Sequence, residues 1–83
     1  MKEFIIEEHK KDLVAVLEYD VDTLYLYMCR MVGGEINILD SLNIGLPNVD
    51  IKESDFKLDW SSVNVVKVMY LGKLIAEYPV KIS

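Results

Sequence analysis

The chain has 83 residues, of which 52% are hydrophobic and 28% charged, and its 14 acidic and 9 basic side chains give a net charge of −5. This length predicts a single domain spanning residues 1–83. The hydrophobic share argues against intrinsic disorder. The acidic balance argues against direct nucleic-acid binding as the main activity, because that activity depends on clustered Lys and Arg side chains.

The single cysteine, Cys29, cannot form an intramolecular disulfide, which argues against a disulfide-stapled secreted domain. The longest uninterrupted apolar run, Leu24–Cys29, is far shorter than the ~20 residues of a membrane-spanning helix. The first residues carry acids where a signal peptide would be apolar. We therefore expect a cytoplasmic location and no membrane partner.

The N-terminal third predicts two strands, Glu3–Glu7 and Leu13–Tyr19, around a charged tip. The second strand is apolar at alternate positions on both of its faces, so it is expected to be covered on both sides. The alternative is one helix from Lys2 to about Glu18. Acidic residues fall where Phe4 would need apolar partners one and two turns later, which favours the strands. Asp20–Thr23 is expected to form the next turn.

Gly33-Gly34 separates two apolar runs and predicts a two-residue hairpin turn, because glycine supplies the positive φ angles of a type I′ turn. The expected register pairs Val32 with Glu35 and Cys29 with Ile38. One face of this hairpin then carries Tyr25, Tyr27, Cys29, Met31, Ile36 and Ile38. We expect this tyrosine face to pack in the core.

A second hairpin is expected near Gly72, between Val63–Tyr70 and Lys73–Ile82, because both segments are rich in Val, Ile and Tyr. A Gly72-Lys73 loop would place Met69 and Val65 on the face of Leu74 and Ala76. A three-residue loop through Leu71 would instead bring Val66, Val68 and Tyr70 to that face. The sequence leaves both loops open, and Pro79 marks an edge strand.

The segment Asp40–Asp59 is expected to be irregular, because Gly45 and Pro47 interrupt any regular element. Ser54-Asp55 is a candidate cap for one short helical turn through Phe56–Leu58. Apolar residues at spacing two from Phe56 to Trp60 fit a strand equally well.

The expected fold is mainly β: a small antiparallel meander of about six strands that closes into a barrel or a sandwich, with at most one short helical turn. One small sheet buries only one face, yet Leu24, Leu26 and Met28 lie opposite the tyrosines. These residues need a cover. A second sheet of the same chain is the first expectation, and a short helix or another protein chain is the alternative.

No catalytic or metal-binding pattern stands out, so the sequence predicts neither an enzyme nor a cofactor. Structural zinc sites use four Cys or His ligands, whereas the chain has His9 and Cys29 only. The serines lie in no nucleophile elbow, and Cys29 is expected to be a buried small hydrophobe.

The sequence therefore favours a non-enzymatic protein-binding module, and its acids favour a partner with a basic surface. Small acidic inhibitors made by phages and mobile elements share this size and charge. The expected contact residues lie in the long connection, where aromatic side chains stand beside acids. They are Asp55, Phe56, Asp59 and Trp60. For Trp60, plugging the end of the core is the competing role. Alternatives are a homodimer with a ligand pocket lined by Tyr19, Tyr25 or Tyr27, and a structural subunit that assembles through edge strands.

Overall fold

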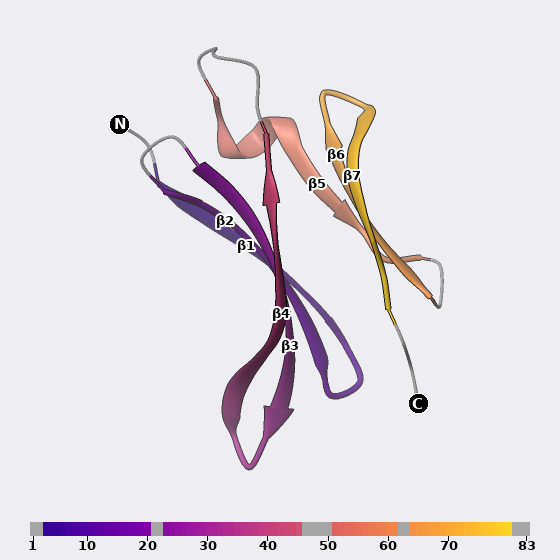
Figure 1. Ribbon diagram of the computed structural model, residues 1–83. Helices are drawn as coiled ribbons and strands as arrows, with labels where there is room; N and C mark the ends of the chain where they lie inside the picture. Colours follow the sequence, from indigo (N-terminus) through magenta and orange to yellow (C-terminus); the bar gives the residue numbers. More distant parts are fainter. Residues whose placement is uncertain (1–2, 21–22, 46–50, 62–63, 81–83) are drawn as a thin grey trace.

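The computed structural model describes residues 3–20, 23–45, 51–61 and 64–80. In these ranges the chain forms seven strands and one 3₁₀ turn, so the mainly-β prediction is confirmed. The strands form two antiparallel sheets, in each of which neighbours in sequence lie side by side (Figure 1). The four-stranded sheet contains β1 (Phe4–Lys10), β2 (Leu13–Asp20), β3 (Thr23–Val32) and β4 (Glu35–Ile44). The three-stranded sheet contains β5 (Phe56–Asp59), β6 (Val65–Tyr70) and β7 (Lys73–Pro79), and the 3₁₀ turn η1 (Glu53–Asp55) precedes it.

The N-terminal strands are confirmed over the helix. β1 and β2 pair from Phe4↔Tyr19 to Lys10↔Leu13. The tip is shorter than expected, because β1 continues to Lys10 and only Lys11 and Asp12 form the turn, with Lys11 at φ 58°. Glu8 and His9, which were expected in the tip, instead lie on opposite sides of this edge strand and are exposed. Part of the Asp20–Thr23 turn lies outside the described residues.

The first glycine hairpin is confirmed in turn and register. Gly33 and Gly34 have φ angles of 58° and 84°, and the pairs Val32↔Glu35 and Cys29↔Ile38 form as expected. The register then shifts, so that Leu39 is an extra residue in β4 and Asp40 pairs with Met28. β4 runs on to Ile44, which corrects the expected irregular start at Asp40. Pairing with β3 turns Leu42 and Ile44 toward the core.

Residues 46–50, which include Pro47 of the segment expected to be irregular, lie outside the described residues. The helical alternative required a turn through Phe56–Leu58. The 3₁₀ turn η1 instead ends at Asp55, before that segment. Phe56 and Leu58 alternate into the core as strand β5, because spacing two puts both on one face of a strand.

The C-terminal hairpin turns at Leu71 and Gly72, whose φ angles are 50° and 80°. A register shift at Ile75 then pairs Val68 with Ala76. The turn therefore contains two residues. Because of the register shift, Val66 and Val68 point inward, as expected for the three-residue loop.

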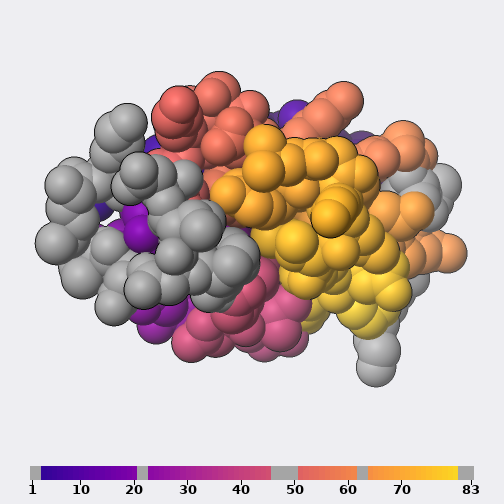
Figure 2. Space-filling view, turned by 90° about the horizontal axis from the view of Figure 1, so that it is seen from above, coloured from indigo at the N-terminus to yellow at the C-terminus, as the bar shows by residue number. Residues whose placement is uncertain are grey.

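The two sheets share one core. The side chains of Leu17, Leu24 and Leu26 from the larger sheet and Val66 and Val68 from the smaller one are fully buried in it. The ring of Phe4 on β1 lies 5.3 Å from that of Phe56 on β5, centroid to centroid. In Figure 2, the atoms of β6 and β7 lie against the segment 51–59 on one side and β4 on the other. The expected cover by a second sheet of the same chain is therefore present, and closure into a barrel or sandwich stays a prediction.

The core uses the opposite face of β3 from the one expected. Leu24, Leu26 and Met28 pack against the three-stranded sheet, whereas Tyr25 and Tyr27 face away from it. Both faces of β2 and β3 are apolar, so alternation alone did not distinguish the covered face from the uncovered one. No helix in the described ranges has the length and apolar content needed to cross a membrane.

Candidate functional site

The structure places the expected contact residues around β5. Asp55, Phe56 and Asp59 line a shallow pocket of about 420 Å³, together with Lys57, Met69 and Leu71. Phe56 is 6% exposed and Trp60 9% exposed, and both belong to the core cluster. The two aromatic side chains therefore offer a partner little surface, and the carboxylates of Asp55 and Asp59 are the accessible part of this set.

Local contacts occupy part of this pocket wall. The Asp59 carboxylate accepts a hydrogen bond from the Ser61 amide at 3.0 Å. Hydrogen bonds from Ser61, assisted by the positive charges of Lys67 and Lys57, lower the pKa of Asp59. The backbone carbonyl of Asp55 accepts a hydrogen bond from the Leu71 amide at 2.9 Å. These contacts tie η1 and β5 to the second hairpin.

Trp60 has a separate set of neighbours. The Lys10 ammonium group donates to the Trp60 carbonyl at 3.2 Å and lies 5.7 Å from the centre of the indole ring. The indole N–H is buried, and among the residues that the structure describes it has no hydrogen-bond partner. These contacts join β1 to the end of β5. They agree with the competing role for Trp60, in which it plugs the end of the core.

A larger candidate surface is the face of the four-stranded sheet that points away from β5–β7. We call it the outer face. Its members follow from the strand registers: Ile5, Glu7, His9, Val14, Val16, Glu18, Asp20, Thr23, Tyr25, Tyr27, Cys29, Met31, Ile36, Ile38, Ser41 and Asn43.

Apolar side chains fill the middle of the outer face. The rings of Tyr25 and Tyr27 stack with centroids 5.8 Å apart. Val14 and Cys29, which pair across β2 and β3, are 0% and 2% exposed although the second sheet lies on the other side. Their burial therefore does not come from the core between the two sheets. Ile36 and Ile38 extend this surface onto β4 and stay largely exposed.

Carboxylates border the apolar middle. Glu18 pairs with Tyr25, and Glu7 pairs with Val16 on the opposite side of β2. Partial burial, reinforced by the charges of Glu18 and nearby groups, raises the pKa of Tyr27. Burial, reinforced by Glu7, raises the pKa of the Cys29 thiol. Burial is the larger cause of both shifts, and the carboxylates are the smaller one.

The raised pKa also bears on chemistry at Cys29. A thiol with a raised pKa holds less thiolate at neutral pH, which makes it a weaker nucleophile. His9 lies on the same face, with Nε2 3.2 Å from a Glu7 carboxylate oxygen. In the described parts of the chain, no three His, Cys, Asp or Glu side chains gather closely enough to hold a metal ion.

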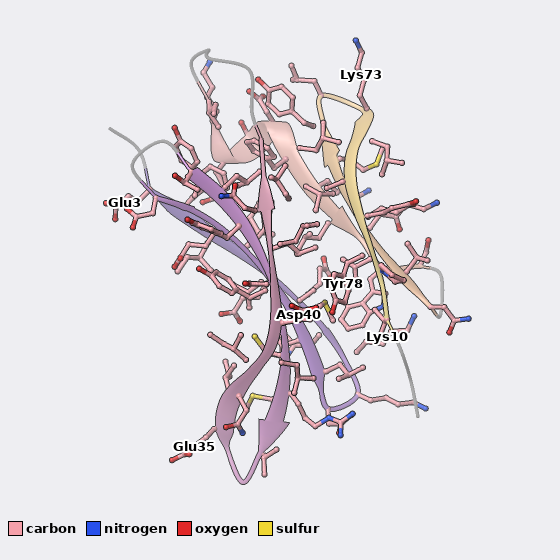
Figure 3. The ribbon with its side chains drawn as sticks, viewed as in Figure 1. Glu3, Lys10, Glu35, Asp40, Lys73 and Tyr78 are labelled. Carbon is pink, nitrogen blue, oxygen red and sulfur yellow. The ribbon has the colours of Figure 1, made fainter. Side chains whose placement is uncertain are left out.

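A third surface lies between the sheets at one end. Asp40 and Tyr78 meet there from β4 and β7, and the Tyr78 hydroxyl donates to the Asp40 carboxylate at 2.5 Å (Figure 3). With Arg30 and Leu39 they line a groove of about 440 Å³. Arg30 itself faces Asp12 at 3.7 Å.

The structure separates the three tyrosines of the expected ligand pocket. Tyr25 and Tyr27 lie on the outer face, whereas Tyr19 lies on the inner side, where its ring stacks on Phe4 at 5.4 Å. A pocket at a dimer interface could therefore use Tyr25 with Tyr27, but not Tyr19 with either of them.

Sequence reasoning identified every apolar member of the β3–β4 part of this face but assigned them to the core. The signal that distinguishes the outer face is its rim of Glu7, Glu18 and Asp20, which alternate with apolar residues on β1 and β2. Searches against protein-family models, curated proteins and solved structures found nothing similar to this chain.

Proposed function

We propose that the protein is a non-enzymatic binding module that captures another protein on its outer face. The observation that carries the proposal is an apolar and aromatic sheet face over which the described residues form no second layer. Soluble domains rarely leave contiguous apolar surface uncovered unless it serves an interaction. Tyrosines suit such a role, because a rigid ring with a polar end contributes contact area at small entropic cost.

The charge of the outer face supports a partner with a basic surface. Among the described residues assigned to this face there are three carboxylates, Glu7, Glu18 and Asp20, and neither Lys nor Arg. A partner that presents Arg or Lys beside apolar side chains would match this pattern. Arginine fits best, because its guanidinium stacks on tyrosine rings and pairs with carboxylates. Capture of such a surface would inhibit a partner that uses it for another ligand.

The pocket at β5 is the competing binding surface. It combines the Asp55 and Asp59 carboxylates with the apolar side chains of Met69 and Leu71. Lys57 stands in the same pocket, and Lys57 and Lys67 already interact with Asp59. This partial neutralisation is why we favour the outer face for a basic partner.

The proposal includes a cytoplasmic location. Its support is Cys29, a free and buried thiol, which suits a reducing compartment. The anionic binding face argues for a protein partner over a nucleic acid, whose phosphates would be repelled.

The test uses a short peptide of alternating arginine and leucine as a defined probe, titrated into the full chain at several salt concentrations. Replacing the outer-face acids in the double variant Glu7→Gln/Glu18→Gln should weaken binding by a factor of roughly two to ten and flatten its salt dependence. The matched control, Asp55→Asn/Asp59→Asn, removes the same charge at β5 and should leave binding unchanged.

Three outcomes contradict the proposal. Loss of binding only in the β5 variant would move the site to that pocket. Equal binding of a peptide with glutamate in place of arginine would remove the charge argument. Absence of saturable binding to the arginine peptide would remove its support altogether.

A further inference from the structure

The edge of the four-stranded sheet at β4 is a second feature that predicts a partner. β4 is the last strand of its sheet, and its residues from Glu35 to Ser41 are all exposed. The β3–β4 hairpin extends away from the three-stranded sheet, with Glu35 at its tip (Figures 1 and 3). An edge strand presents backbone N–H and C=O groups on its open side, and these groups pair readily with another strand.

The other described edges carry stronger protective features than the middle of β4 does. β1 contains charged residues such as Glu7, Glu8 and Lys10, β5 has only four residues, and β7 ends at Pro79. The residues of β4 include no Lys, Arg or Pro, and its two acids, Glu35 and Asp40, flank the run Ile36–Leu39. The extra residue Leu39 interrupts the register, so the regular run beside β3 is Glu35–Ile38.

We propose that the segment Glu35–Leu39 pairs antiparallel with the same segment of a second copy, with Asn37 on the twofold axis. Ile36 of each copy then lies opposite Ile38 of the other, and Glu35 lies opposite Leu39. The inference goes beyond the proposed capture of a basic protein and does not depend on it.

The side chains of the segment are self-complementary in this register. Ile36 and Ile38 are 48% and 63% exposed, so pairing would bury aliphatic surface that the single chain leaves in water. The Asn37 amide carries both donors and an acceptor, so two copies can hydrogen-bond across the axis, as two carboxylates cannot. Glu35, the acidic residue of the segment, does not lie opposite Glu35 of the other copy.

The arrangement is closed and leaves the part of the outer face on β1–β3 open. A twofold axis uses the same edge of both copies, so assembly stops at the dimer. Both outer faces then lie on one side of a continuous sheet, joined through Ile36 and Ile38. The acids Glu7 and Glu18 remain on β1 and β2, away from the axis.

The first measurement is sedimentation of the full chain from low micromolar to submillimolar concentration, with a monomer–dimer equilibrium expected. Ile38→Lys should raise the dimer dissociation constant at least about tenfold, because a charge enters the paired edge. Leu71→Lys is the matched control, since Leu71 is equally exposed at 63% and lies in the β6–β7 turn. It should leave the equilibrium unchanged.

The second measurement tests the register by cross-linking under mild oxidation. Asn37→Cys should form a disulfide-linked dimer. Asn43→Cys, the same substitution at an exposed position on β4 beyond the bulge, should not. The wild-type chain, whose thiol is buried, controls for cross-linking through Cys29.

A chain that stays monomeric over the whole range would overturn the proposal, and so would continued growth into larger polymers. Equal effects of Ile38→Lys and Leu71→Lys, or cross-linking through position 43 in preference to 37, would do the same. The arginine peptide should still bind Asn37→Asp, because position 37 lies off the outer face, whereas two carboxylates at the axis should weaken the dimer. Failure of the dimer and failure of partner capture therefore remain distinguishable.

Discussion

Asp40 and Tyr78 form a hydrogen bond that joins the two sheets outside the apolar core. The Tyr78 hydroxyl and the Ser41 amide lower the pKa of Asp40, and the same hydrogen bond raises the pKa of Tyr78. Folding therefore favours ionised Asp40 together with neutral Tyr78. The Asp40 contribution is present above the ordinary Asp pKa and is lost as the pH falls through the lowered value. The Tyr78 contribution is lost as the pH rises through its raised value.

Tyr78→Phe should therefore lower the free energy of unfolding most in the neutral range. The difference from wild type should shrink at both acidic and alkaline extremes. Urea unfolding over a pH series measures this dependence. Tyr70→Phe, whose ring packs on Phe56 at 4.8 Å, is the control for loss of a tyrosine hydroxyl away from Asp40. A pH-independent effect of Tyr78→Phe would contradict the assigned linkage.

Cys29 offers a second test at the residue scale, because it is buried on the face that points away from the three-stranded sheet. Its burial and raised pKa both slow reaction with a disulfide reagent. If only unfolded molecules react, a stability of about 5 kcal/mol predicts labelling roughly 1000-fold slower or more in native buffer than in denaturant. Rapid stoichiometric labelling of the native chain would show that the outer face does not shield Cys29.

At the scale of elements, the β3–β4 turn depends on the left-handed backbone of Gly34, with φ 84°. A Cβ atom added there would have no atom within 4 Å, so Gly34→Ala isolates the backbone cost. We expect a loss of about 1 kcal/mol in the free energy of unfolding. Gly45→Ala is the control, because its Cβ also meets open space and its φ lies outside the left-handed range. Equal effects in chemical denaturation would contradict this explanation.

Turns and strands were predictable from the sequence to different degrees. The Gly33-Gly34 pair fixed both turn and register, because two positive φ angles and alternating apolar residues point to the same hairpin. The β4 extension to Ile44 was missed, because the extra residue Leu39 breaks the alternation. The second hairpin stayed ambiguous for a related reason: the register shift at Ile75 changes which residues share a face.

At the scale of the whole molecule, the sequence predicted that a second layer was needed but not which face it would cover. Leu24 and Tyr25 are both plausible core residues on β3, and the choice depends on where the three-stranded sheet packs. The candidate site could likewise be predicted only in part, because it also depends on how distant parts of the chain pack. Asp55 and Asp59 reach a surface pocket, whereas the burial of Phe56 and Trp60 depends on contacts with residues distant in sequence, such as Phe4 and Lys10.

Every strand pair in both sheets joins neighbours in sequence. Each hairpin therefore closes only a short loop, and such local contacts cost little chain entropy to form. Contacts between the sheets are the ones that require distant parts of the chain to meet. We infer that the hairpins form early and that docking of the two sheets completes folding. Until docking occurs, Leu24, Leu26 and Met28 are exposed on one face while Tyr25 and Tyr27 are exposed on the other. The folding chain therefore exposes two apolar faces that can bind other chains, and the native state still exposes one of them.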